Sequence, residues 1–423
     1  MSTKSSGKNS SRTSTSSPAK SHHRIRRGSN PVVDLSTVGR VLLVGLELAK
    51  NRWVMAFGDG RNRRYVTIAG RDWAAFDEAL ESSKKKFGLP EDVPVVVVQE
   101  AGRDGFWVHR YLVSQGIQSL VVDPASVPIP RRKRRRKTDR IDARLLLQCL
   151  VRFHLLDDKK VFSVVRVPDY EVQEQRLLLR ERSRLIKEQT ALRNRIKSKL
   201  AEKGLVDVTL DKKFTERIKR FRTPGSNNEL SPYLVCELER AYERYDLIVS
   251  QLRDVEESIE TLARAGTNLL AESDCPVPEL ALTPAQRASV NCELLRGFRG
   301  IGLQGAVGLA YEFYWRPFDK PKETGPAAGL IPSPYNTGNS ERDQGISKQG
   351  NRTVRALAIE IAWLWVRWQP NSSITKWFNE GFAQGSRRRR KVGIVGVARR
   401  LLGQLWRYLN DGVVPEGAIL KYS

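Results

Sequence analysis

The sequence predicts an α/β domain, then a long antiparallel pair of helices, then a mainly α-helical C-terminal domain. Three patterns indicate this order. Short apolar runs separated by Gly and Asn occupy the first third, heptad-like apolar repeats occupy the middle, and amphipathic segments rich in Trp follow. A chain of 423 residues with 40% hydrophobic residues is long enough for two or three domains with packed cores.

We expect four segments along the chain. Residues 1–37 consist mainly of Ser, Thr, Lys and Arg. We expect a disordered basic tail there, because such residues cannot bury enough apolar surface to offset the entropy lost on ordering. The α/β domain should span residues 38–160, the helical arm residues 165–272 and the C-terminal domain residues 285–423.

The first domain has the expected element order of an RNase H-like fold. Apolar runs and turn residues predict, in order, strands at 41–46, 53–57 and 65–68, a helix at Trp73–Lys86, a strand at 94–98, a helix at Phe106–Gln115 and a strand at 119–122. The continuous β-branched run Val95–Val98 is typical of a central strand covered on both faces. Three strands, helix, strand, helix, strand is the order characteristic of RNase H-like α/β domains.

The middle of the chain carries two apolar series at helical spacing. Leu178, Leu185 and Leu192 are seven residues apart, and a second series runs from Leu238 to Leu262. The connection at about 203–232 contains Gly, Pro and Asn, which favour turns. The pattern predicts an antiparallel coiled-coil arm, which could pair within one chain or between two chains.

The C-terminal third is expected to be helical, chiefly at Thr353–Trp368 and Val392–Leu409. Phe298–Gly302, followed by Ala306, resembles a helix-hairpin-helix turn, whose backbone N–H groups can hold a phosphate. A plain glycine turn between packed helices is the alternative interpretation.

The charge balance indicates a polyanionic partner. The formal net charge is +26, and Lys or Arg bound to phosphate releases counterions. A membrane surface would also attract this charge, but the sequence has neither an apolar run near 18 residues nor a signal-peptide pattern. We therefore expect a soluble, cytoplasmic protein. The cysteines form no CxxC pair, so a zinc knuckle or a redox motif is not supported.

Four carboxylates form the strongest candidate site. Glu47 and Glu100 end two apolar strands, and Asp139 and Asp142 lie three residues apart at the start of a helix expected at Ile141–Leu150. Each acid alone could be an ordinary strand-end or helix-start charge. Together they would repel one another unless a cation lay between them, and two Mg²⁺ ions about 4 Å apart would satisfy all four.

A basic run directly precedes the two aspartates. It consists of Arg131, Arg132, Lys133, Arg134, Arg135, Arg136 and Lys137. Such a run is often a solvated face, but beside a proposed Mg²⁺ site it favours contact with a DNA backbone.

Ordered motifs in both halves of the chain resemble one family. They are Gly45–Lys50 (GLELAK), Gln99–Gly102 (QEAG), Lys137–Ala143 (KTDRIDA), Ala328–Pro332 (AGLIP), Tyr335–Gly338 (YNTG), Gly345–Asn351 (GISKQGN) and Pro415–Ala418 (PEGA). With these motifs the chain resembles the DEDD transposases of the insertion-sequence-110 family, and its ending is most similar to the 1111 subgroup. The similarity covers about residues 40–420.

The resemblance implies a RuvC-like (RNase H-like) DEDD catalytic domain, a coiled-coil arm and a C-terminal transposase domain. It also implies DNA recombination directed by a structured non-coding RNA of the element, called a bridge or seeker RNA. In this family a serine of the C-terminal domain links covalently to donor or target DNA, and dimers assemble into tetramers. A prokaryotic, nucleoid-associated location follows from the same resemblance.

Two positions depart from the family pattern. The first acid is usually Asp and here is Glu47, which is one methylene longer. The nucleophilic Ser falls on Thr337, whose hydroxyl can attack phosphorus but whose side chain is bulkier and stiffer. Ser340 is the competing nucleophile, and Ser333 is a distant third. Alternatively, Thr337–Gly338 is simply a turn in an inactive chain.

Several basic and polar residues after Thr337 are candidate nucleic-acid contacts. Lys348, Asn351, Arg352 and Arg355 would hold the scissile phosphate, although the last two could be an ordinary basic helix face. The run Arg387, Arg388, Arg389, Arg390 is expected to contact guide RNA or DNA backbone.

Two other functions remain open at this stage. A metal-dependent nuclease of branched DNA would need only the N-terminal acids and no covalent intermediate. A nucleic-acid packaging protein would explain the charge, but not acids placed in apolar strands.

Overall fold

The computed structural model describes residues 40–128, 138–271, 282–337 and 340–421, and at 334–344 it describes the backbone alone. The expected basic tail and the run Arg131–Lys137 lie outside the described residues. The chain divides into two compact units that meet in sequence at Val165 and Arg166. No helix in the described ranges is both long enough and apolar enough to cross a membrane.

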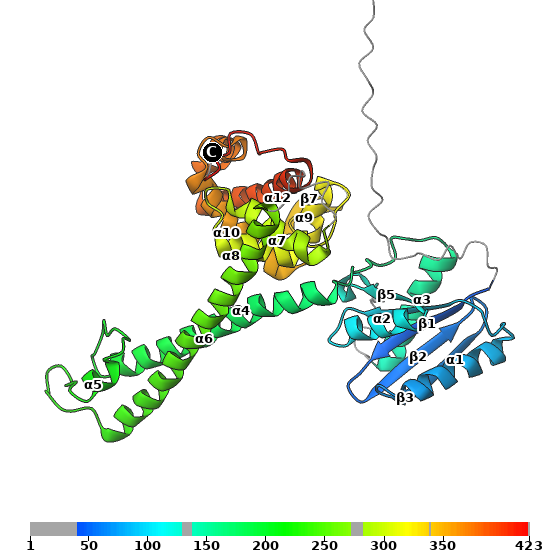
Figure 1. Cartoon of the computed structure of the whole chain (residues 1–423), viewed down its shortest axis with the longest axis horizontal. Coiled ribbons are helices and arrows are strands. Elements are labelled where there is room, and N and C mark those ends of the chain that lie inside the picture. The colour runs from blue at the N-terminus through cyan, green and yellow to red at the C-terminus, as the bar shows by residue number, and fades with distance from the viewer. Residues whose placement is uncertain (1–39, 129–137, 272–281, 338–339, 422–423) are drawn as a thin grey trace, which may run out of the picture. The chain divides into compact units, whose positions relative to one another are not determined.

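The first unit contains a mixed five-stranded sheet (Figure 1). Its strands are β1 (Leu42–Leu48), β2 (Arg52–Gly58), β3 (Arg63–Ala69), β4 (Val95–Glu100) and β5 (Gln118–Val122), in the order β3-β2-β1-β4-β5. Strands β1, β2 and β3 pair antiparallel, whereas β4 pairs parallel with both β1 and β5. The helices are α1 (Trp73–Phe87), α2 (Gly105–Ser114) and α3 (Asp139–Leu155). The element order expected from the sequence is confirmed.

Alternation along the strands sorts the side chains onto two faces of the sheet. Leu43, Val96 and Val98 pack with α3, whereas Leu42 and Val97 pack with α1 and α2. Both faces are therefore covered, which explains why β1 and β4 are almost continuously apolar.

Gly45 sets how closely α3 approaches β1. A Cβ at this position would lie 2.4 Å from the carbonyl oxygen of Ala143 and 2.5 Å from the backbone nitrogen of Leu147. Only glycine leaves room for this contact, so Gly45 allows the first turns of α3 to lie directly against the strand that carries Glu47.

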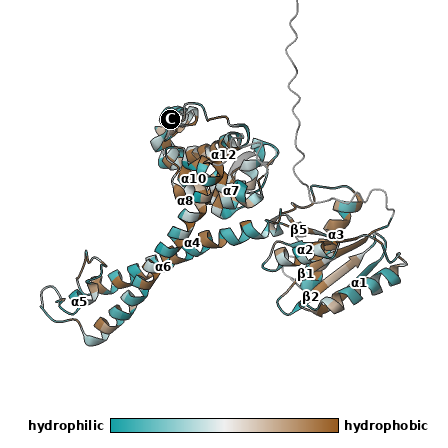
Figure 2. Ribbon diagram, viewed as in Figure 1, coloured by the Kyte–Doolittle hydropathy of each residue, from teal (hydrophilic) through white to brown (hydrophobic). Residues whose placement is uncertain are grey.

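The second unit begins with two long helices, α4 (Tyr170–Ala201) and α6 (Pro232–Ala271) (Figure 1). Arg182 donates to Glu256 at 2.9 Å, and Arg195 donates to Glu237 at 2.9 Å. Residue numbers rise along α4 as they fall along α6, so the helices are antiparallel and pack on each other within the chain. In Figure 2 both helices alternate between hydrophobic and hydrophilic residues, while β1 and β2 are mostly hydrophobic.

The connection between α4 and α6 was expected to be a turn region, but it also contains a short helix, α5 (Phe214–Ile218). Phe214 packs against Tyr242 of α6 with ring centroids 4.9 Å apart. Tyr242 also donates its hydroxyl hydrogen to the carbonyl oxygen of Asp211 at 2.6 Å. These contacts give the connection a small apolar core of its own.

The rest of the second unit is mainly helical. Its elements are α7 (Pro284–Arg296), α8 (Leu303–Leu309), a π-helical turn (Ala310–Tyr314), a 3-10 turn (Pro321–Glu323), α9 (Thr324–Ala327), β6 (Pro332–Thr337), β7 (Ser340–Ile346), α10 (Arg352–Trp368), α11 (Ser373–Phe378), a π-helical turn (Asn379–Ala383) and α12 (Arg387–Asp411). Trp365, Phe298 and Tyr311 are fully buried in its core. Helix α12 begins five residues earlier than expected, because the Ser386 side chain caps it by accepting from the Arg389 backbone N–H.

Candidate functional site

Two of the four carboxylates end neighbouring parallel strands. Glu47 lies near the end of β1, and Glu100 is the last residue of β4. Gly45 pairs with Val98, so the same register continued by two residues sets Glu47 beside Glu100, at an interstrand spacing of about 4.8 Å. Both acids share the alternation of Leu43 and Val98, which pack toward α3. Both are half-buried.

Asp139 and Asp142 lie in the first turn of α3, as expected. Thr138 caps this helix by accepting from the Ile141 backbone N–H at 3.3 Å. Asp142 is followed by Ala143, whose carbonyl oxygen lies against Gly45. The start of α3 therefore lies over β1 at Gly45, which is two residues before Glu47.

Arg52 binds Asp139, an interaction that reading the sequence did not reveal. The Nε and Nη2 atoms of Arg52 both donate to the Asp139 Oδ2 atom, at 2.9 and 2.8 Å. The Arg52 side chain is 63% exposed and that of Asp139 is 30% exposed. Exposed pairs of this kind contribute only about 0–1 kcal/mol, so another cation can displace the arginine.

The donor set fits a hard divalent cation in kind, because all four side chains offer carboxylate oxygens. Within the part of the chain that the structure describes, however, no group of three or more His, Cys, Asp or Glu residues is arranged to hold a metal ion. The acids share one region of the domain without forming a closed set of ligands, and one of them is bound to an arginine.

The candidate nucleophiles lie at the end of a β-hairpin. Thr337 is the last residue of β6, Ser340 is the first of β7, and the two are partners in the antiparallel register. Ser333 lies where the register shifts between Pro332 and Pro334. The side chains of Thr337 and Ser340, like residues 338–339, lie outside the described part of the structure.

The four expected phosphate ligands after the hairpin divide into two pairs. Arg355 donates to the carbonyl oxygens of Lys348 and Ala328, at 3.1 and 3.3 Å, and so braces the turn before α10. Asn351 caps α10 by accepting from the backbone N–H groups of its second and third residues. Lys348 and Arg352 remain exposed, which leaves these two as the accessible cations.

The cationic run Arg387–Arg390 forms the first turn of α12. Arg389 donates to the carbonyl oxygen of Gly381 at 3.1 Å and lies over the ring of Phe382. All four arginines are exposed. Positive charge at a helix N-terminus opposes the helix dipole, so this placement weakens the helix in the absence of an anion.

The glycine turn at Phe298–Gly302 does connect two helices, α7 and α8. Gly300 has a φ of 88°, and a Cβ there would lie 3.1 Å from the carbonyl oxygen of Leu364. Lys421 donates to the carbonyl oxygens of Arg296 and Ile301. The turn thus packs against α10 and the C-terminal segment.

Two family models match the chain. One, described as a DEDD transposase of IS110 type, matches residues 44–203. The other, described as a transposase of the IS116/IS110/IS902 family, matches residues 292–376. The first range contains all four carboxylates, and the second contains Thr337 and Ser340.

Curated relatives agree with these matches. The chain is 35% identical over 390 residues to a putative transposase, y4rJ, of Sinorhizobium fredii, covering 90% of this chain and 94% of that protein. It is 24% identical to the transposase for insertion sequence element IS1328 of Yersinia enterocolitica, covering 76% and 85%. It is 25% identical to the transposase for IS1111A of Coxiella burnetii, covering 64% and 65%.

Proposed function

The chain belongs to the IS110 family of DEDD transposases and is an enzyme that acts on DNA; we propose that it cuts and rejoins DNA with a hydroxyl nucleophile, under the direction of a structured guide RNA. The observation that carries this proposal is the pairing of Glu47 and Glu100 at the ends of adjacent parallel strands, on the face covered by α3. Carboxylates at the carboxyl edge of an α/β sheet are positioned to meet a ligand there.

Glu47, Glu100 and Asp142 would hold the divalent metal, which we take to be Mg²⁺ with two ions per site. Asp139 would join them once Arg52 leaves it. When bound, the metal supplies charge stabilisation to the attacking and leaving oxygens of the phosphoryl transfer. The released Arg52 guanidinium is then available to bind a phosphate of the DNA.

Thr337 is the proposed nucleophile, and Ser340 is the alternative. The hydroxyl gives up its proton to solvent, its oxygen bonds to phosphorus, and the bond from phosphorus to the deoxyribose oxygen breaks. The departing oxygen takes up a proton, so one phosphodiester is exchanged for another without an external energy source. Lys348 and Arg352 would hold the phosphate during this exchange.

Nucleic acid would contact the chain at two further groups of cations. These are Arg131–Lys137 before the acids and Arg387–Arg390 at the start of α12. We also propose that α4 and α6 form a coiled-coil arm used in assembly to dimers and tetramers. The domain division proposed is a tail at 1–37, a catalytic domain at 38–160, an arm at 165–272 and a C-terminal domain at 285–423.

The nucleophile is tested by trapping the protein–DNA adduct. Purified full-length protein is mixed with donor DNA, target DNA, the non-coding RNA encoded beside its gene, and Mg²⁺, and the products are separated on a denaturing gel. Thr337→Ala should abolish the adduct, whereas Thr337→Ser and Ser340→Ala should retain it. An adduct that survives in both alanine variants and in their double variant would overturn a hydroxyl nucleophile in this hairpin.

A metal-dependent nuclease of branched DNA is the second candidate, favoured by the replacement of Ser by Thr at position 337. It requires cleavage of a four-way DNA junction that continues in Thr337→Ala and stops in Glu100→Gln. The transposase proposal requires both variants to lose strand exchange.

A further inference from the structure

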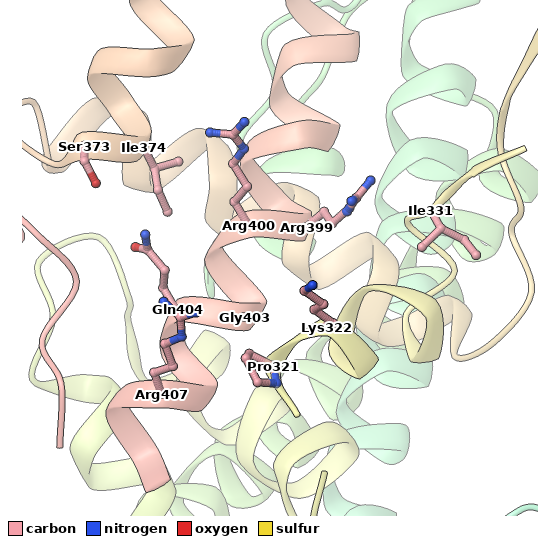
Figure 3. A pocket seen from close by; sticks show the side chains of 10 residues that line it. All are labelled: Pro321, Lys322, Ile331, Ser373, Ile374, Arg399, Arg400, Gly403, Gln404 and Arg407. Atoms are coloured by element: carbon pink, nitrogen blue, oxygen red, sulfur yellow. The ribbon is translucent and has the colours of Figure 1, made fainter. Parts of the chain in front are cut away.

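A cavity of about 640 Å³ opens in the second unit, between α12, the turn at Pro321–Glu323 and the start of α11 (Figure 3). Four of its lining side chains are cations: Lys322, Arg399, Arg400 and Arg407. No lining residue is acidic. The cavity is separate from the hairpin cations and from the first turn of α12, so it is an additional concentration of positive charge.

The cations of this cavity differ from several arginines on the long helices. Arg182 and Arg195 each have a glutamate partner. In the described residues, by contrast, Lys322, Arg399 and Arg407 form no ion pair with any carboxylate, and all three are exposed. Like charges gathered around one hollow repel one another, and an anion bound between them removes that repulsion.

Helical spacing keeps the cavity open. Arg399, Gly403 and Arg407 follow one another at intervals of four along one side of α12. Gly403 has no side chain to fill the space between the two arginines, and a Cβ there would lie 3.4 Å from the carbonyl oxygen of Pro321. The two guanidinium groups therefore flank a gap bordered by backbone.

Arg400 is held in place by an aromatic ring. Its guanidinium carbon lies 3.8 Å from the centre of the Trp377 ring of α11. Trp377 in turn fits against α12 at Gly396, where a Cβ would lie 2.8 Å from the ring. A guanidinium fixed in this way loses less entropy when it binds an anion, and its planar fork matches the oxygens of a phosphate.

The cavity also adjoins the strand that leads to the candidate nucleophile. Ile331 lines it and directly precedes β6, whose last residue is Thr337. Six residues of strand span about 20 Å, so the Ile331 side of the cavity lies within about 20 Å of Thr337.

We propose that this cavity binds the phosphodiester backbone of the DNA that the enzyme cuts, at a position several nucleotides from the scissile phosphate. The proposal rests on the family assignment, which makes DNA the substrate, and not on the identity of the nucleophile or the metal. Contacts from arginine and lysine to phosphate oxygens carry no sequence information, so binding in this cavity should be independent of sequence.

The test uses the full-length protein and a fluorescein-labelled duplex DNA of about 40 base pairs and arbitrary sequence, in EDTA so that no chemistry occurs. The cavity variant is Lys322→Gln/Arg399→Gln/Arg407→Gln. The control variant, Lys85→Gln/Lys86→Gln/Lys212→Gln, removes the same charge at exposed lysines of α1 and of the α4–α6 connection. Affinity is measured by anisotropy across a series of KCl concentrations.

We expect the cavity variant to lose about tenfold or more in affinity, and the slope of log K against log salt to become shallower by about 2 to 3, since each lost phosphate contact removes about 0.9. The control variant should keep nearly the parent slope. The variant Arg399→Lys/Arg407→Lys, which keeps the charge, should retain most of the parent's affinity and salt slope. Equal losses in the cavity and control variants would show a general charge effect and overturn the proposal.

A parallel titration with a duplex RNA of the same length separates the two kinds of backbone. A slope change confined to RNA would overturn the DNA assignment. Unfolding temperatures of all variants confirm that the fold is intact, and the charge-preserving variant keeps the test decisive if glutamines destabilise α12. Because binding is measured without metal, loss of the adduct with intact binding would count against the nucleophile and not against this cavity.

Discussion

Arg176 of α4 and Glu312 of the π-helical turn form a buried ion pair that joins the long helices to the C-terminal helices. The Arg176 Nε atom donates to the Glu312 Oε2 atom at 3.0 Å, and both side chains are at most 10% exposed. The more exposed Arg180 also approaches Glu312, at 3.6 Å. Two residues 136 positions apart thereby fix the point where α4 meets the helical core.

Breaking this pair should destabilise the second unit strongly. Glu312→Gln leaves the Arg176 guanidinium buried without a counter-charge, which costs about 3–5 kcal/mol of unfolding free energy. Glu256→Gln is the matched control: it removes the partner of Arg182 at a more exposed position, and should cost about 1 kcal/mol or less. Urea unfolding followed by circular dichroism measures both. Similar losses of unfolding free energy in the two variants would show that burial does not make the Arg176–Glu312 pair more important for stability.

Arg52 should compete with metal for Asp139. In Arg52→Gln, Asp139 is no longer held by a cation, so the Mn²⁺ or Mg²⁺ concentration that half-saturates the protein should fall by up to about fivefold, equivalent to about 1 kcal/mol. Titration with Mn²⁺, followed by electron paramagnetic resonance of the free ion, measures this directly. Arg63→Gln on the exposed edge of β3 is the control. An unchanged or raised metal requirement in Arg52→Gln would contradict the competition.

Gly45 should tolerate no side chain. Gly45→Ala places a Cβ against the backbone of Ala143 and Leu147, so α3 must shift away from the sheet. We expect a loss of about 1–3 kcal/mol in unfolding free energy, together with weakened metal binding, because the shift also moves Asp142. Gly102→Ala, where a Cβ meets nothing within 4 Å, serves as the control for stability. Unperturbed stability of Gly45→Ala would mean that α3 does not lie as close as described.

His109 should make the first unit less stable in mild acid. Burial, and secondarily the nearby Arg110, lower the pKa of His109 below its ordinary value of 6.5. At a pH between the folded-state pKa and 6.5, His109 is protonated in the unfolded chain but neutral in the folded chain, and this difference favours unfolding. The first unit therefore keeps its full stability above about pH 6.5 and loses part of it as the pH falls through the folded-state pKa. Unfolding temperatures from pH 7.5 to pH 5 should fall less steeply in His109→Gln than in the parent protein. Parallel curves would exclude His109 as a source of the acid sensitivity.

Much of the first unit could be predicted from sequence because its signals are local. The Val-rich run, the Gly and Asn turns and the two aspartates at the start of α3 each depend on neighbouring residues. Arg52 and Asp139 could not be paired in this way, since they are 87 residues apart and meet only because Gly45 lets α3 lie on β1. Arg52 lies on β2, the strand beside the one that carries Glu47, so no pattern within a single strand links it to the acids.

The hairpin was missed for a different reason. Its first strand contains Pro332 and Pro334, and proline is depleted in strands because it has no backbone N–H to donate. The sequence also could not predict that Asn351 caps α10 or that Arg355 braces the turn before it. Both roles depend on where α10 begins relative to Ala328. The sequence motifs predict that this segment holds phosphate, but they do not distinguish side chains that support the backbone from those that face solvent.

The four arginines in the first turn of α12 link helix winding to ligand binding. Their charges oppose the dipole of the helix that carries them, so the first turn unwinds more readily when no anion is near. A polyanion that neutralises them removes this opposition and tightens the turn. If these arginines contact nucleic acid, as proposed above, binding and winding reinforce each other, and the first turn of α12 should become more ordered when nucleic acid is present.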